Sequence, residues 1–210
     1  MKSFCHLICI AVLLLSVSCD LNLSSGDLVF VSSESSDFEK SIVSVTKNVD
    51  KLLNFTHVGI LNVTDSGIFV IEAIPEKGVV YTNIQDFKAE NKNGILYFAS
   101  LKPKYKKYVN KALWRAYSHL GKGYDYAFDF KNDLYYCSEL VYDAFVYASG
   151  DSMFFETPNM TFKEIGTEEI LPYWVEYFEK IDVPIPEGKS GINPNGLSQS
   201  DKLKIKKSKF

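Results

Sequence analysis

The stretch FTHVGILNVTDSGIFVIEAI, residues 55–74, constrains the fold of this chain more than any other. Two runs rich in Val and Ile flank the sequence TDSG, whose residue types favour a tight turn. Strands joined by so short a turn must pair antiparallel, because a parallel pair needs a long crossover connection. Residues 55–74 therefore predict a β-hairpin and an antiparallel sheet around it.

The remaining elements extend this sheet and add helices. A β-rich run at 25–32 predicts a strand, and apolar residues at spacings of three and four predict a helix over 37–52. Further strands are predicted at 78–84, 94–101 and near 203–205, with helices over 102–120 and from 136 onward. This order is typical of an α+β protein with a mostly antiparallel sheet packed on helices, rather than of repeated βαβ units.

Length and composition exclude several function classes. The chain has 210 residues, 46% of them hydrophobic, which is enough for one domain with one core. The formal net charge is −3, so no basic excess favours nucleic acid. The sequence has no Gly-rich phosphate loop and no Cys/His cluster, so we expect neither a cofactor nor a metal.

Residues 1–18 have the features of a secretory signal that is cleaved before Cys19, leaving 19–210 as a single domain. Lys2 precedes an apolar run over 7–15, which is too short to span a membrane convincingly. The sequence SVSC also resembles a degenerate bacterial lipobox. We therefore expect Cys19 to be lipidated and to anchor the protein to a membrane of the cell envelope. The alternative is a freely secreted protein with a free Cys19.

Cysteine usage singles out Cys137. Cys5 and Cys9 leave with the signal and Cys19 is expected to be acylated, so Cys137 has no disulfide partner. It lies in YYCSELVYDAF, at the start of an amphipathic helix. One interpretation is a buried, inert cysteine. The other is a nucleophile, because the unpaired N–H groups and the dipole at a helix N-terminus favour a thiolate and a developing oxyanion.

His57 favours the nucleophile. A lone histidine at the start of the apolar run THVGIL is often structural, but a cysteine nucleophile needs an imidazole as base or ion-pair partner. His6 leaves with the signal, and His119, near a helix end, is better explained as a C-terminal cation or a surface residue. We expect His57 and Cys137 both to face the interior.

Glu72 is the candidate for orienting the imidazole. Suppose that the hairpin pairs Thr64 with Gly67. Glu72 then lies opposite Gly59 and diagonally next to His57 on the same face, about 7–8 Å away at the backbone and within reach of a glutamate. A slip of one residue would move Glu72 to the other face, and an exposed position on an edge strand is the alternative.

Five motifs, in this order, resemble those of permuted NlpC/P60-type cysteine hydrolases, the YiiX/YebB-like group: GDLVFV, THVGIL, VIEA, GKGYDYAFDF and YYCSELVYDAF. The terminal NPNGLSQSDKLKIKK resembles the end of those proteins, so the likeness covers nearly all of the chain after residue 18. In ordinary NlpC/P60 enzymes the cysteine helix precedes the histidine strand. Here His57 precedes Cys137 by 80 residues, as in the permuted form.

The resemblance implies a circularly permuted papain-like fold with the nucleophile helix at its centre. Cys137 would be the nucleophile, His57 the base and Glu72 the residue that orients His57. Tyr124 matches an aromatic position near the nucleophile, where it would bind substrate or complete the oxyanion hole. Asp125 would be a turn residue.

The expected function is a cysteine hydrolase that cleaves an amide through a thioester acyl-enzyme. Behind an export signal, peptides of the cell wall are the expected substrates. Relatives like lecithin–retinol acyltransferase suggest an alternative, an acyl-lipid hydrolase or acyltransferase, because the aromatic residues over 124–136 could line an apolar cleft. A second alternative is a non-catalytic lipoprotein that binds a ligand on the same fold. The expected partners are a peptide or acyl small molecule and, through the anchor, a membrane.

Overall fold

The computed structural model describes residues 22–46 and 54–207, with side chains through Ile205. The expected signal, Cys19 and the end of the helix predicted over 37–52 lie outside these residues. The described part is built on a six-stranded sheet in the order β4-β3-β2-β1-β5-β6, and every strand pair is antiparallel. The strands are β1 (Leu28–Ser32), β2 (His57–Thr64), β3 (Gly67–Ile74), β4 (Gly78–Asn83), β5 (Ile95–Leu101) and β6 (Leu203–Lys207).

The β2–β3 hairpin has the predicted register. Thr64 pairs with Gly67, and the ladder continues toward Glu72, whose Cβ lies 3.3 Å from where a Cβ on Gly59 would be. Because β3 also pairs with β4, Glu72 lies on an inner strand and is only 1% exposed. The alternative of an exposed edge position is therefore wrong.

The helices depart from the sequence predictions in four places. The stretch predicted as one helix over 102–120 begins as a 3₁₀ helix and becomes α-helical only at Val109. Three short helices were not predicted: those over Ile84–Glu90 and Pro194–Ser198 are too short to show a period, and the one over Pro172–Lys180 begins at a proline, where a missing N–H is tolerated. The helices of the described residues are α1 (Asp37–Thr46), α2 (Ile84–Glu90), η1 (Pro103–Tyr108), α3 (Val109–Tyr117), α4 (Cys137–Ser149), α5 (Pro172–Lys180) and α6 (Pro194–Ser198).

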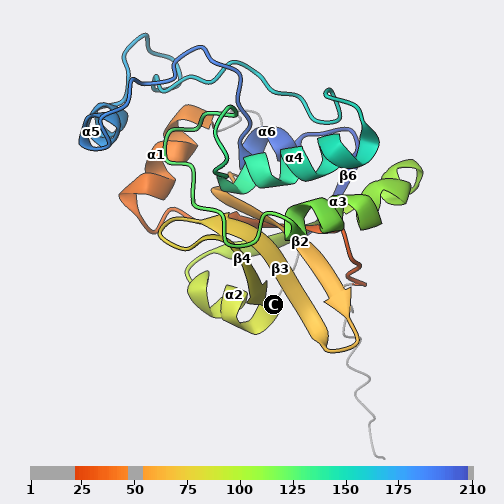
Figure 1. Ribbon diagram of the computed structural model, residues 1–210. Coiled ribbons are helices and arrows are strands. Elements are labelled where there is room, and N and C mark those ends of the chain that lie inside the picture. The colour runs from red at the N-terminus through yellow and green to blue at the C-terminus, as the bar shows by residue number, and fades with distance from the viewer. Residues whose placement is uncertain (1–21, 47–53, 208–210) are drawn as a thin grey trace, which may run out of the picture.

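Helices cover both faces of the sheet (Figure 1). α4 packs on α3 and against β2 and β3, and α2 lies on the opposite face. The main core fills the α4 side and contains, all fully buried, Val58, Ile60, Leu140, Val141 and Phe145. The second core, under α2, contains Val29, Leu61, Val70 and Phe87. Successive residues of β2 therefore enter different cores, as the alternation of a strand requires.

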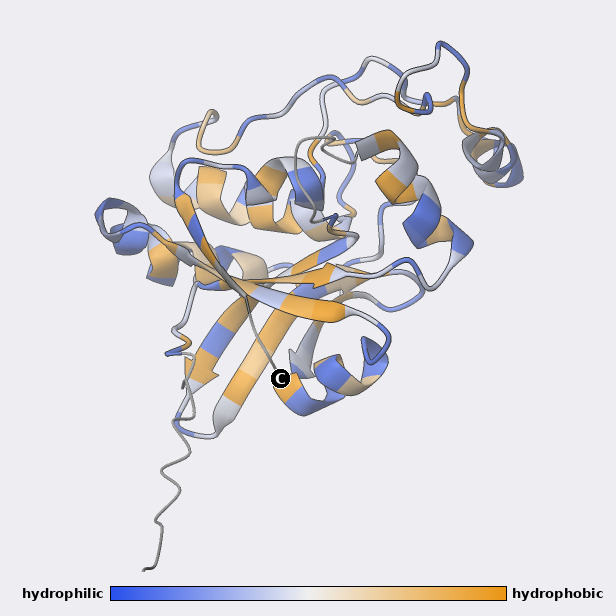
Figure 2. Ribbon diagram, turned by 180° about the vertical axis from the view of Figure 1, so that it is seen from behind, coloured by the Kyte–Doolittle hydropathy of each residue, from blue (hydrophilic) through white to orange (hydrophobic). Residues whose placement is uncertain are grey.

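A third apolar cluster joins α1 to the long connection that follows α4. Its buried members are Val45, Phe162, Trp174 and Phe178. Hydrophobic residues are concentrated along the strands and on the helix sides that face them, and hydrophilic residues predominate in the outer connections (Figure 2). Among the described helices, none has the length and apolar character needed to cross a membrane.

Candidate active site

Cys137 is the first residue of α4. The helix begins here because Tyr136 has extended N-cap dihedrals, and its backbone N–H donates to the Glu139 carboxyl group at 3.3 Å. Gly150, with a φ of 71°, ends the helix in a left-handed conformation that glycine adopts without strain. The N–H groups of this first turn have no partners within the helix. The thiol, on a residue 7% exposed, therefore lies beside donors suited to an oxyanion.

His57 and Glu72 form a close pair. The His57 Nε2 and Glu72 Oε2 atoms are 2.6 Å apart. The Glu72 side chain is 1% exposed and that of His57 is 17% exposed, so the imidazole is open to the cleft while the carboxylate is shielded behind it. With Nε2 engaged by Glu72, Nδ1 is the ring nitrogen left for Cys137.

The two halves of the site reach each other around the end of the sheet. Since Val58 and Ile60 point toward α4, His57 lies on the other face, where its ring stacks on Phe87 of α2 with centroids 6.1 Å apart. His57 is thus largely buried, as expected of a residue that faces the interior, but it lies on the sheet face opposite the one against which Cys137 and α4 pack. His57 and Cys137 nevertheless lie close enough to interact, because His57 is the first residue of β2 and both side chains line the cleft where α4 begins.

The pKa of His57 reflects this pair of neighbours. Burial alone would lower it, but hydrogen bonds to Cys137 and Glu72, together with their negative charges, raise it to about 10. The imidazole is therefore protonated at neutral pH. The Glu72 carboxylate holds this imidazolium from one side, and Cys137 lies on the other.

Tyr124 lies in the loop that leads into α4 and lines the same cleft as Cys137. Burial raises the pKa of Tyr124 well above its ordinary value, and the charge of Cys137 adds to the effect. The phenol thus remains protonated and can donate a hydrogen bond. Two contacts hold this loop in place. Tyr124 and Tyr135 form an isolated β-bridge, and the Val79 N–H of β4 donates a hydrogen bond to Lys122 O at 2.8 Å.

Two buried carboxyl groups lie behind the loop. Asp125, fully buried, accepts hydrogen bonds from the N–H groups of Ala127 and Asp129 and from the Asn132 amide, at 2.6–3.0 Å. It is a turn residue, as predicted. Burial, reinforced by the charge of Asp125, raises the pKa of Glu139 to about 9, so Glu139 is neutral at pH 7 and does not oppose a thiolate on the same helix turn.

The cleft at Cys137 has a volume of about 380 Å³. His57, Glu72 and Cys137 are among the residues that line it. Much of the remaining lining is apolar and aromatic and comes from α1, the loop before α4, the connection around 158–162 and α5: Phe38, Ile42, Phe128, Met160, Phe162 and Trp174. The sequence placed aromatic residues only at 124–136, so most of this wall was missed.

The segment 192–195 ties the cysteine helix to the histidine strand, and the sequence analysis missed it. Ser138 of α4 donates to Ile192 O at 3.0 Å. Asn195, 2% exposed, accepts from the Phe55 N–H at 2.6 Å, two residues before His57. The only signal was the motif NPNG, which indicates a turn but not a buried amide.

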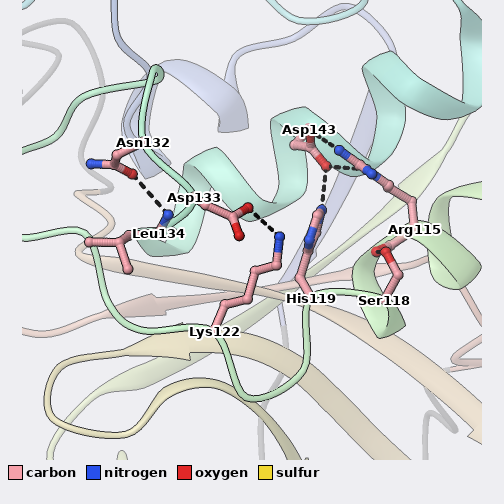
Figure 3. Close-up of polar contacts among 8 residues, drawn as sticks. All are labelled: Arg115, Ser118, His119, Lys122, Asn132, Asp133, Leu134 and Asp143. Atoms are coloured by element: carbon pink, nitrogen blue, oxygen red, sulfur yellow. Dashed lines mark hydrogen bonds and ion pairs between the residues drawn. The ribbon is translucent and has the colours of Figure 1, made fainter.

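His119 lies away from the cleft, and its prediction as a surface residue or C-terminal cation is wrong. It is 2% exposed, and its Nε2 lies 2.7 Å from the Asp143 carboxylate, which also accepts two bonds from Arg115 (Figure 3). Burial lowers the pKa of His119, and Arg115 and Lys122 act in the same direction, so it is neutral at pH 7. The cluster fastens α3 to α4.

A helix-start thiol, an imidazole from a preceding strand and a carboxylate behind it, on an antiparallel sheet, define a papain-like cysteine hydrolase whose histidine and cysteine occur in permuted order. A sequence model described as "permuted papain-like amidase enzyme, YaeF/YiiX, C92 family" matches residues 22–205. The chain belongs to this family of cysteine peptidases and amidases.

A solved structure supports the fold. The crystal structure titled metalloprotein yiiX from Escherichia coli O157:H7 matches with a TM-score of 0.69 and 23% identity, covering 89% of this chain and 98% of that one. No curated protein matches the chain. That title names a metalloprotein, yet the described residues here include no group of three or more His, Cys, Asp or Glu side chains that could hold a metal ion.

Proposed function

We propose that this protein is an exported cysteine amidase that cleaves peptide amides derived from the cell wall, with Cys137 as nucleophile, His57 as acid and base, and Glu72 as the residue that orients His57. The observation that carries the proposal is the grouping of three side chains at one cleft: His57 is bonded to Glu72 at 2.6 Å and interacts with Cys137, and all three line a cleft that admits a ligand.

The reaction follows from these positions. The Cys137 thiolate attacks the amide carbonyl carbon, and the carbonyl oxygen becomes an oxyanion that the backbone N–H of Cys137 and the Tyr124 hydroxyl can stabilise. His57 gives its proton to the leaving nitrogen as the C–N bond breaks, which leaves a thioester on Cys137. Neutral His57 then takes a proton from water, and the resulting hydroxide attacks the thioester to release the acid and restore the ion pair.

Export and anchoring rest on the sequence. The apolar run over 7–15 and the small residues before Cys19 support cleavage and acylation there, which would place the enzyme near cell-wall peptides. The test is fractionation of cells that express the chain or its Cys19→Ser variant. After a high-salt wash, which weakens electrostatic attachment, the wild-type chain should remain with membranes and the variant should appear in the soluble fraction. A variant retained equally after that wash would contradict acylation at Cys19.

The catalytic assignment is tested with Cys137→Ala and His57→Ala, assayed on peptidoglycan-derived peptides. Each should lower kcat/KM by at least about 10³-fold while the circular dichroism spectrum is unchanged. Iodoacetamide should label Cys137 at neutral pH, and His57→Ala should stop this labelling, because the thiolate loses its cation. His119→Gln is the matched control and should label normally. Full activity in Cys137→Ala would end the assignment.

One observation favours a second candidate, an acyl-lipid hydrolase or acyltransferase. The walls formed by Phe38, Phe128 and Phe162 would accommodate an acyl chain at least as well as a polar peptide. A screen of short- and long-chain acyl esters and amides against muropeptide fragments separates the two. Turnover of acyl substrates alone would move the substrate class from peptides to lipids while leaving the roles of Cys137 and His57 in place.

A further inference from the structure

One surface of the molecule, on η1 and α3, is strongly basic. Residues 102–122 carry seven Lys and Arg and no Asp or Glu. Three of these lysines, Lys104, Lys107 and Lys111, are exposed and lie three and four residues apart, so they project from the same side of the helix. The opposite side, with Ala112 and Ala116, is fully buried against the core.

Exposed aromatic rings continue this side of the helix. Trp114 is 60% exposed and stacks on Tyr147 of α4, with ring centroids 5.7 Å apart and planes at 27°. Lys111 Nζ and Arg115 Cζ lie 4.8 and 4.9 Å from the centroid of the same Tyr147 ring. These six residues form what we call the basic aromatic face: Lys104, Lys107, Lys111, Trp114, Arg115 and Tyr147.

We propose that the basic aromatic face binds the surface of an anionic lipid membrane. Indole and phenol rings prefer the headgroup region, where an apolar ring and a polar N–H or O–H are both accommodated. Lysines beside them contribute attraction to anionic headgroups, and the face has the basic helical side with an added tryptophan that is typical of interfacial helices. A nucleic acid is the alternative polyanionic partner, and binding to DNA is compared in the test below.

The first described residues of the chain lie beside the basic helix. Residues 24–27 lie against the start of α3, and together with Lys106, Val109 and Asn110 they line a small surface pocket. Gly26 is so close to Val109 that an added Cβ would come within 2.5 Å of its side chain. The described chain thus begins beside the basic helix. The face does not need an acyl group on Cys19 in order to bind.

The test is co-sedimentation of the full chain with vesicles, using Cys19→Ser throughout so that no acyl chain contributes. The protein should bind vesicles of 30% phosphatidylglycerol in phosphatidylcholine, bind phosphatidylcholine alone at least tenfold more weakly, and lose affinity as salt is raised. Each lysine near an anionic surface is worth about a fivefold factor, so Lys104→Glu/Lys107→Glu/Lys111→Glu should weaken binding roughly a hundredfold or more.

The matched control is Lys92→Glu/Lys180→Glu/Lys189→Glu, with the same three charge reversals at exposed lysines elsewhere on the molecule. It should retain binding within about threefold, since an effect of overall charge alone is weak in salt. Equal loss in both variants would overturn the proposal, as would equal binding to neutral vesicles or tighter binding to DNA than to anionic vesicles.

Tryptophan fluorescence gives a second, local measurement. The chain has two tryptophans, of which Trp114 is 60% exposed and Trp174 is 2% exposed. Anionic vesicles should shift the emission to shorter wavelength, and Trp114→Phe should remove the shift while folding is preserved. If the protein that retains Trp114 binds vesicles with no spectral shift, Trp114 does not enter the headgroup region, and the proposed contact of this face with the membrane is contradicted.

Discussion

At the residue scale, the site depends on one cation, protonated His57, between the Glu72 carboxylate and the Cys137 thiol. The Glu72 carboxylate is 1% exposed, and among the described residues its Oε1 has no hydrogen-bond partner. A carboxylate shielded from water in this way depends on a positive neighbour for its stability. Protonated His57 supplies that charge and serves Cys137 at the same time, so Glu72 both positions the ring and holds its proton.

The first prediction concerns Glu72→Gln. The carboxylate raises the pKa of His57, which is about 10, so its removal should lower that pKa by about 1–3 units. Since acylation needs the imidazolium, activity should fall as pH rises through the pKa of His57. The alkaline limb of the kcat/KM profile should therefore move from near pH 10 toward neutral pH in the variant.

The control for this shift is Glu90→Gln, which removes a carboxylate from the cleft lining that pairs with Lys77 and not with His57. Its alkaline limb should stay in place. Glu72→Ala should lower activity less than Cys137→Ala, because it removes orientation and not the nucleophile. An unchanged profile in Glu72→Gln would mean that Glu72 does not set the proton affinity of His57.

Among the residues of the site, the sequence predicted those whose role follows from a pattern in the neighbouring sequence. Cys137 shows the period of a helix start, and Glu72 follows from the turn chemistry of one hairpin. Asn195 and His119 carry no such signature, because their burial is produced by elements far away in the chain. His119 looks like a surface residue until Asp143, 24 residues later, packs against it.

At the element scale, the active geometry is held by links between segments rather than by any one of them. Phe55, just before β2, is bonded to Asn195 of α6, and Asn195 in turn donates to Thr46 Oγ1 of α1 at 2.8 Å. α4 is bonded to residue 192 of the segment 192–195, because Ser138 donates to the Ile192 carbonyl oxygen. The distance from imidazole to thiol is therefore fixed by residues 192–195.

The second prediction is that Asn195→Ala weakens catalysis as well as stability. It leaves the buried Phe55 N–H without an acceptor, which should lower the free energy of unfolding by about 1–3 kcal/mol. Because the start of β2 is then free to shift, kcat should fall about tenfold with KM little changed, and the alkaline limb should move to lower pH as His57 loses its contact with Cys137.

Two variants separate positioning from plain destabilisation. Asn195→Asp keeps the acceptor oxygen toward Phe55 and should recover part of the lost kcat. Ser198→Ala removes a 2.7 Å bond to the Asn195 carbonyl within α6 but no contact with β2, so it should leave the pH profile unchanged. If Asn195→Ala also leaves the pH profile unchanged, the role of Asn195 is structural only.

The third prediction concerns the α3–α4 junction and acid. The folded state lowers the pKa of His119 below 6.5 and that of Asp143 below 3.8. Their contribution to stability is thus complete above pH 6.5, declines first as His119 must be protonated, and declines further below pH 3.8. His119→Gln cannot be protonated, so its unfolding free energy, measured in urea, should change less between pH 7 and 5 than that of the wild type. An equal change would assign the acid sensitivity to other groups.

Secondary structure was predicted best where the pattern is local. The hairpin and α4 have clear periods, whereas α2 has only seven residues and the 3₁₀ form of η1 has no distinct sequence signal. The face of the sheet on which each side chain lies was harder to predict than the strands themselves. His57 alternates away from the α4 core, and only the end of the sheet brings it to Cys137, which no strand pattern could show.

At the scale of the whole molecule, the cleft and the basic aromatic face lie toward opposite ends of α4. Cys137 begins the helix, and Tyr147, ten residues later, is roughly 15 Å further along its axis. Every residue that lines the cleft lies outside 95–123, the part of the chain that contains η1 and α3. A molecule bound to a membrane through α3 would therefore keep its cleft open to water.

The last prediction joins the two proposals. If the basic aromatic face binds anionic lipid, saturating vesicles should leave kcat/KM for a soluble peptide amide within about twofold of its value in free solution, because no cleft residue belongs to the bound surface. The same vesicles carrying a cleavable acyl-lipid should show little turnover, since the thiol lies at the far end of α4. Strong vesicle inhibition of the peptide reaction would place the cleft at the membrane, and efficient turnover of the embedded lipid would show that the aromatic walls receive acyl chains directly from the bilayer. Both measurements use the Cys19→Ser chain, with Lys104→Glu/Lys107→Glu/Lys111→Glu added in the non-binding reference, so a change that persists in that reference cannot come from docking.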